Sequence, residues 1–186
     1  MKVKTYIKKT KTVAVRLVHE TNYTSTDVPD ADIESFLKKV YNQAVFEFSV
    51  TRLTAKTVEF DTVTTTKDAS GTLTHTPGAD TQVDVESWMS AEMIKIRDEC
   101  KDGKYDYNIF LVDKPSDGST GYMSYDQRYG FVHADNSGKP ESTFAHELGH
   151  GGFKLKHTLS DKDNIMYNYA SSTKWRLRKD QWDQIH

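Results

Sequence analysis

The chain has 186 residues and a mass of 21.2 kDa, which predicts one domain spanning residues 1–186 with a substantial core. Its formal net charge of −2 gives no overall sign of nucleic acid or a membrane surface as a partner. No apolar run approaches the ~20 residues of a membrane-spanning helix, and the first residues lack the apolar core of a secretory signal, so we expect neither in this chain.

The first part of the chain predicts a strand, a helix and a further strand region. Residues 11–19 are largely β-branched and alternate roughly in burial preference, which is typical of a strand. Pro29 and Asp30 then open a helix, with Asp30 as its N-cap. The Val-, Thr- and Phe-rich stretch 48–60 fits either one bent strand or two strands separated near Thr54. The apolar residues that recur at helical spacing are Ile33, Phe36, Leu37, Val40, Ala44 and Val45.

The middle of the chain contains an undecided segment and a second helix. Residues 62–82 are rich in Thr, Ser, Gly and Asp, and they fit either an exposed hairpin or a loop. The helix that follows ends at Gly103. Cys100, the only cysteine, lies on its apolar stripe and is predicted to be a buried structural thiol, and no intrachain disulfide can form. The stripe consists of Val85, Trp88, Met89, Met93, Ile96 and Cys100.

A strand at residues 105–112 is predicted to be central in the sheet. Its last four residues, Ile-Phe-Leu-Val, are all apolar, which is typical of a strand covered on both faces. Two successive strand–helix units before it favour an α/β fold with a mixed sheet whose main strands are parallel. Two short strands, 121–125 and 130–134, precede a helix that starts at Pro140. A closing C-terminal helix is indicated by Leu177, Trp182 and Ile185.

Residues 143–150, Thr-Phe-Ala-His-Glu-Leu-Gly-His, carry the strongest functional signal. On a helix His146 and His150 lie one above the other, with ~5–6 Å between their Cβ atoms, so both imidazoles can bind one metal ion. Glu147 lies about 100° further round the helix, where its carboxylate can act as a general base on a water beside the metal. Imidazole ligands favour zinc, which in a catalytic site has three protein ligands. The sequence therefore predicts one zinc ion per chain.

His157 is the first candidate for the third ligand. Gly151 and Gly152 predict the end of the helix and a reversal that returns His157 to the metal. If His157 is not a ligand, Asp161 or Asp163 can supply a carboxylate, although a solvated turn is the interpretation we favour for both. A basic cluster near the C-terminus is interpreted as a solvated face and contains Lys174, Arg176, Arg178 and Lys179. The isolated histidines interpreted as surface or hydrogen-bonded residues are His19, His75, His133 and His186.

With this helix-borne HExxH, a later histidine and a methionine within the turn-like segment 164–169, the chain resembles the metzincins, a family of zinc endopeptidases. The family pattern is HExxHxxGxxH. Here Phe153 stands at the glycine position and Lys156 at the third-histidine position, so His157 comes one residue late. We interpret this as a longer loop that reaches the same metal. A narrower resemblance, to HExxH protease domains of bacterial secreted or toxin-like proteins, implies a secreted or extracellular location.

The resemblance implies a twisted mixed α/β sheet with an antiparallel edge strand, two backing helices, the HExxH helix and a C-terminal helix. It assigns Met166 to a Met-turn beneath the metal. It also implies that the edge strand binds an extended peptide by strand addition, for which an ordinary hairpin without ligand is the alternative. In some family members a tyrosine two residues beyond the methionine stabilises the oxyanion, but here that position is Asn168, between Tyr167 and Tyr169. The candidate substrate contacts are Gly121, Tyr122, Met123 and Tyr169.

These features predict a zinc-dependent endopeptidase that acts on protein or peptide substrates. Glu147 would take a proton from the attacking water and pass it to the departing amine. One alternative is a zinc hydrolase that acts on another amide or an ester. The other is a binding module with an inert zinc ion, against which the intact Glu147 argues.

Overall fold

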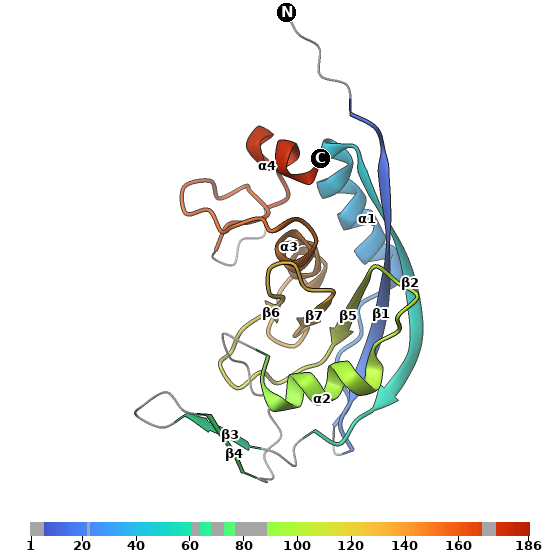
Figure 1. Cartoon of the computed structure of the whole chain (residues 1–186), viewed down its shortest axis with the longest axis vertical. Helices are drawn as coiled ribbons and strands as arrows, with labels where there is room; N and C mark the ends of the chain where they lie inside the picture. Colours follow the sequence, from blue (N-terminus) through green and yellow to red (C-terminus); the bar gives the residue numbers. More distant parts are fainter. Residues whose placement is uncertain (1–5, 22, 61–63, 68–72, 77–88, 169–173) are drawn as a thin grey trace, which may run out of the picture.

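The computed structural model describes residues 6–21, 23–60, 64–67, 73–76, 89–168 and 174–186. Within them the main sheet has five strands in the order β2-β1-β5-β7-β6 (Figure 1). Its strands are β1 (Lys9–His19), β2 (Phe46–Thr57), β5 (Tyr107–Leu111), β6 (Gly121–Tyr122) and β7 (Tyr129–Val132). The helices are α1 (Asp30–Tyr41), α2 (Ala91–Cys100), α3 (Pro140–Phe153) and α4 (Lys179–Ile185). In the described part of the chain, none of the helices has the length and apolar character needed to cross a membrane.

The sheet is mixed, as predicted. β1, β2, β5 and β7 pair in parallel, whereas β6 pairs antiparallel with β7 and forms one edge. β5 lies in the middle of the sheet, and its side chains are buried on both faces. Ile109 and Leu111 belong to one hydrophobic core with α1 and α3, while Phe110 and Val112 belong to a second core with α2. α1 and α3, together with Ile185 of α4, therefore pack on one face, and α2, which lies apart from them in Figure 1, covers the other.

The first half of the chain follows the prediction with two clarifications and one correction. The region 48–60 contains one strand rather than two, since β2 runs without a break from Phe46 to Thr57. α1 continues into a short 3-10 helix, η1 (Asn42–Ala44). The prediction that Asp30 caps α1 was wrong, because Pro29 holds the N-cap position without a side-chain hydrogen bond. Asp30 is instead the first helical residue, where its carboxylate accepts a hydrogen bond from Arg52 Nε at 2.8 Å.

The undecided middle segment contains a hairpin. β3 (Thr64–Lys67) and β4 (Leu73–Thr76) pair antiparallel in a separate two-stranded sheet. α2 begins after Ser90, whose side chain caps the first turn. The sequence also predicted Val85 and Trp88 as part of this helix, but both lie outside the described residues. Cys100 is buried, as predicted, at 1% exposure.

α3 continues through Gly151 and Gly152, so the prediction that these glycines end it was wrong. The helix ends at Phe153, and the chain reverses at Lys154, which adopts a left-handed φ of 56°. Gly151 is needed for close packing instead, because a Cβ atom there would lie 2.1 Å from Cε of Met123. The helix can therefore approach the segment after β6 closely.

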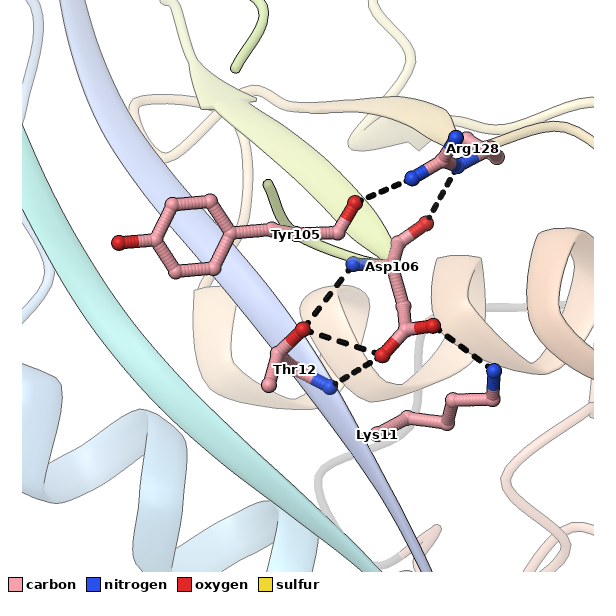
Figure 2. A network of polar contacts seen from close by, with 5 residues as sticks. All are labelled: Lys11, Thr12, Tyr105, Asp106 and Arg128. Atoms are coloured by element: carbon pink, nitrogen blue, oxygen red, sulfur yellow. Dashed lines mark hydrogen bonds and ion pairs between the residues drawn. The ribbon is translucent and has the colours of Figure 1, made fainter. Parts of the chain in front are cut away.

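A polar network joins the start of β1 to the segments that lead into β5 and β7 (Figure 2). The Asp106 carboxylate accepts hydrogen bonds from Lys11 Nζ at 2.7 Å and from the backbone N–H of Thr12 at 2.9 Å. The backbone N–H of Asp106 donates to Thr12 Oγ1 at 3.0 Å. Arg128 donates from Nε to the carbonyl of Asp106 at 2.9 Å and from its guanidinium to the carbonyl of Tyr105. The network therefore fixes the register of the parallel strands at one end.

Candidate metal centre and cleft

The three histidines of the sequence motif meet at one point. His146 and His150 lie one turn apart on α3, and His157 comes from the segment after the reversal at Lys154. Their Nε2 atoms lie 3.0 Å apart in all three pairs. Among the described residues, they are the group of His, Cys, Asp or Glu side chains whose ligand atoms can share one metal ion.

Backbone carbonyls orient two of these rings. Nδ1 of His146 bonds to the carbonyl of Ile165 and Nδ1 of His150 to the carbonyl of Leu155, each at 2.7 Å. A carbonyl only accepts, so Nδ1 carries the proton and Nε2 keeps its lone pair. Burial lowers the pKa of His150 to about 4 and that of His146 well below its ordinary value. Burial also lowers the pKa of His157. All three imidazoles are therefore neutral at neutral pH, as metal ligands must be.

The donor set fits a zinc ion. The Nε2 atoms of His146 and His150 are both acceptors, so their 3.0 Å approach satisfies neither without a shared cation. The three nitrogens form a triangle with sides of 3.0 Å, whose centre lies about 1.7 Å from each atom. This distance is shorter than the ~2.0–2.1 Å of a Zn–N bond, so one ion can reach all three nitrogens. A histidine whose other ring nitrogen donates to a carbonyl is the usual arrangement around zinc.

Glu147 lies between these histidines and the edge strand. It is 6% exposed, and the backbone N–H of Met123 donates to its carboxylate. Gly121 of β6 packs directly against it, because a Cβ atom there would lie 2.9 Å from Oε1 of Glu147. Burial raises the pKa of Glu147 to about 8, against the opposing effects of the Lys174 charge and the Met123 hydrogen bond. A carboxyl group with such a proton affinity can accept and release a proton near neutral pH.

Met166 is buried and packs against α3 at Gly149. A Cβ atom on Gly149 would be 2.5 Å from Sδ of Met166, so a side chain at this position between the two helix-borne histidines would displace the methionine. The backbone N–H of Met166 donates to Oδ1 of Asn164 at 2.9 Å, which stabilises the turn. Next to Met166, the buried hydroxyl of Tyr41 donates to the carbonyl of Ala145 at 2.5 Å. Together these contacts fix the position of α3 in the core.

The histidines and Glu147 open onto a cleft of about 1180 Å³. The edge strand β6 and the segment after it form one wall, where Gly121, Tyr122 and Met123 all line the cleft. Tyr125 is 48% exposed and packs edge-to-face on His150, with 5.3 Å between ring centroids. Apart from Glu147, Lys139 and Lys174, the cleft is lined mainly by uncharged polar, glycine, histidine and aromatic residues, which suits the main chain of an extended peptide.

The other candidates from the sequence lie elsewhere. The cleft lining contains neither Asp161 nor Asp163, and Asp163 instead faces Arg176, with 3.7 Å between the charged atoms. Tyr167 is not part of the lining either, although the neighbouring Asn168 is. Tyr169 lies outside the described residues.

Several contributors to the site were missed at the sequence level. The interpretation of Lys174 as part of a solvated face was wrong, because its side chain is half-buried and lines the cleft. In the sequence, nothing distinguishes Lys174 from the other basic residues that follow it. Tyr41 had a usable signal, since it follows Leu37 by four residues on the apolar stripe of α1. The carbonyls that orient the histidines have no side-chain signature. His133 is fully buried and bonds through Nδ1 to the carbonyl of Val112 at 2.6 Å.

Neither a family model nor a curated protein matches the sequence. Solved structures do match the fold. Archaemetzincin from Methanopyrus kandleri superposes with a TM-score of 0.59 at 14% identity, covering 94% of this chain and 93% of its own. Metalloproteinase-II from Bacteroides fragilis gives a TM-score of 0.54 at 18% identity, covering 94% of this chain and 52% of its own. A structure of a chaperone–substrate complex gives 0.52 at 12% identity, covering 95% of this chain and 33% of its own.

These comparisons define the class of fold. The chain has a mixed α/β sheet with a fold similar to that of metallopeptidases, and its own group of three histidines is able to hold a metal ion. At identities of 14–18% the likeness concerns the fold alone. The activity has to be argued from the residues of this chain.

Proposed function

We propose that the chain is a single metzincin-like catalytic domain, residues 1–186, with the activity of a zinc-dependent endopeptidase. One observation carries the proposal. Three Nε2 atoms lie 3.0 Å from one another beside a buried glutamate, and all four side chains line one cleft. His146, His150 and His157 would hold the zinc ion, one per chain. A bound zinc ion lowers the pKa of a water molecule to about 7 and polarises a carbonyl group.

Glu147 has the role of proton carrier. Its carboxylate accepts a proton from the attacking water as the water oxygen bonds to the carbonyl carbon of the peptide. The same carboxyl group then gives the proton to the amide nitrogen as the C–N bond breaks, which yields a free acid and a free amine. The raised pKa of about 8 suits both halves of this cycle. The N–H of Met123 and the close contact with Gly121 keep the carboxylate aimed into the cleft.

The edge strand β6 is the proposed substrate platform. It is the last strand in the order of the described sheet and lines the cleft beside Glu147. An extended peptide can add to such an edge through its main chain, with Gly121, Tyr122 and Met123 as the contacts. Protein or peptide substrates follow from this mode of binding. Met166 is proposed as the Met-turn residue, with a packing role and no chemical one, and Tyr169 as a further substrate contact.

The test begins with metal and turnover. The purified chain, loaded with one equivalent of zinc, is incubated with unfolded proteins, a peptide library, ester substrates and cell-wall fragments. We expect cleavage within peptides, loss of activity with a chelator, and recovery on adding zinc. Glu147→Ala should keep one zinc per chain and lose turnover by about 10²–10⁴-fold. A fully active Glu147→Ala variant would rule out this mechanism, and cleavage confined to esters or cell-wall fragments would rule out the endopeptidase.

A further inference from the structure

Lys174 is a cation of the cleft that the proposed mechanism does not yet use. Its half-buried side chain lines the cleft together with Asn168 and the metal-centre residues. Its ammonium group approaches the carbonyl of Tyr167 at 3.5 Å, the long limit of a hydrogen bond. Among the described residues no carboxylate lies within ion-pair distance of it. An ammonium group has three N–H donors, so Lys174 has donor capacity to offer to a ligand in the cleft.

Lys174 shares the lining of one cleft with Glu147 and the three histidines, so its charge faces the reacting centre. Burial lowers the pKa of Lys174 itself. Such a poorly solvated cation gains most from a negative charge that develops next to it.

Other candidate donors in the cleft are less suitable. The hydroxyl of Tyr122 is engaged with Oγ of Ser124 at 2.6 Å. Lys139 is the other lysine of the lining, but it is exposed and lies at the start of α3. Asn168, which also lines the cleft, carries only a neutral amide. Lys174 is therefore the cation best placed to act on the reacting carbonyl.

We propose that the Nζ group of Lys174 donates a hydrogen bond to the carbonyl oxygen of the scissile peptide as that oxygen becomes an oxyanion. The inference rests on the endopeptidase activity proposed above. When the water oxygen bonds to the carbonyl carbon, the π electron pair moves to the carbonyl oxygen, and the ammonium group stabilises this charge without giving up its proton. When the C–N bond breaks, the pair returns to form the new carboxyl group. Lys174 thus contributes more to the transition state than to the bound substrate.

The test compares Lys174→Met, which keeps the length and removes the charge, with Lys174→Arg. Lys162→Met is the matched control, because Lys162 is an exposed lysine in the same region and is not part of the cleft lining. Each zinc-loaded variant is measured for kcat and KM on one peptide. Calorimetry then gives the Kd of each variant for a phosphinic peptide, whose tetrahedral anion resembles the oxyanion. The Kd for the matching substrate peptide is measured after Glu147→Ala is added to each variant, so that the peptide is not cleaved. Zinc content and Tm are recorded for all.

We expect Lys174→Met to lower kcat by about 10²-fold with KM within about twofold of the unaltered chain. The Kd for the phosphinic peptide should rise by a similar factor and the Kd for the uncleaved peptide should not. Lys174→Arg should recover part of both losses, while Lys162→Met changes neither, and zinc content stays at one per chain. An unchanged kcat would overturn the inference, as would a rise in KM alone, which indicates an anchor for a substrate carboxylate. Absence of turnover by the unaltered chain would overturn the proposed function as well.

Discussion

Gly121 offers a sharp test of how closely the edge strand must approach the proposed catalytic base. In Gly121→Ala, the new Cβ atom would lie 2.7 Å from Cγ2 of Thr143, 2.9 Å from Oε1 of Glu147 and 3.0 Å from its Cγ. Carbon atoms pack best at ~3.5–4.0 Å, so β6 and Glu147 must separate by about 1 Å. A displacement of that size at a reacting group costs on the order of 10²-fold in rate.

The same overlap affects stability. Overpacking of a core costs about 1–3 kcal/mol, which for a chain of this length lowers Tm by roughly 2–12 °C. We therefore expect Gly121→Ala to lose about 10²-fold in kcat/KM, to melt earlier, and to keep its zinc, because the three histidines lie off this contact. The assays are cleavage of a fluorogenic peptide, metal analysis and a thermal melt.

Two further variants separate the causes. Adding Thr143→Ser removes Cγ2 but keeps the hydroxyl that bonds to Ser137, so Tm should partly recover while the contacts with Glu147 continue to depress the rate. Gly103→Ala is the control, since nothing lies within 4 Å of a Cβ atom there. If Gly121→Ala were as active and as stable as the unaltered chain, the reasoning about β6 and Glu147 would be refuted.

Three other predictions follow from the fold and the site. Gly149→Ala should displace Met166 and lower stability by about 1–3 kcal/mol, measured by denaturant unfolding, and an unchanged midpoint would contradict the contact of 2.5 Å. Burial raises the pKa of Asp106, but the hydrogen bonds from Lys11 and Thr12 outweigh it, so its pKa is lowered overall. The stability that Asp106 contributes should be present above the ordinary pKa of its carboxyl group and be lost as pH falls through its pKa in the folded state. Melting temperatures of the unaltered chain and of Asp106→Asn, measured over a series of pH values, check this. Two curves of Tm against pH that stay parallel would count against it. Zinc at a hundredfold excess over its Kd should add about 2.7 kcal/mol, so chelation should lower Tm by roughly 5–11 °C, and a Tm insensitive to chelator would speak against a folded-state site.

The sequence predicted those parts of the fold that local pattern controls. The continuous apolar run of β5 indicated a strand buried on both faces, and its two faces do belong to separate cores. Part of each helical stripe was also correct, since α1 buries Ile33, Leu37 and Val40 and α2 buries Met93, Ile96 and Cys100. Val45, predicted for the first stripe, lies beyond α1 and is 37% exposed. The N-cap of α1 was predicted one residue too late, at Asp30, because Pro29 is also compatible with a helix start. Only the backbone geometry decides between the two residues.

The features missed depend on contacts between distant segments. Gly151 satisfies the local rule for a helix end, yet it lies within α3. Its small size suits the position because Met123, 28 positions earlier, packs where a side chain would be. Lys174 is one of several basic residues near the C-terminus, and its place in the cleft lining depends on the packing of segments that are distant in the sequence. The HExxH spacing, in contrast, placed His146, Glu147 and His150 together because helical geometry alone fixes their relation.

The most direct measurement is an anomalous-difference map at the zinc edge from crystals of the zinc-loaded chain. We predict one peak, ~2.0–2.1 Å from the Nε2 atoms of His146, His150 and His157, with its remaining side open to the cleft beside Glu147. A chain that binds no divalent metal, or a peak held by Asp161 or Asp163 in place of His157, would contradict the account.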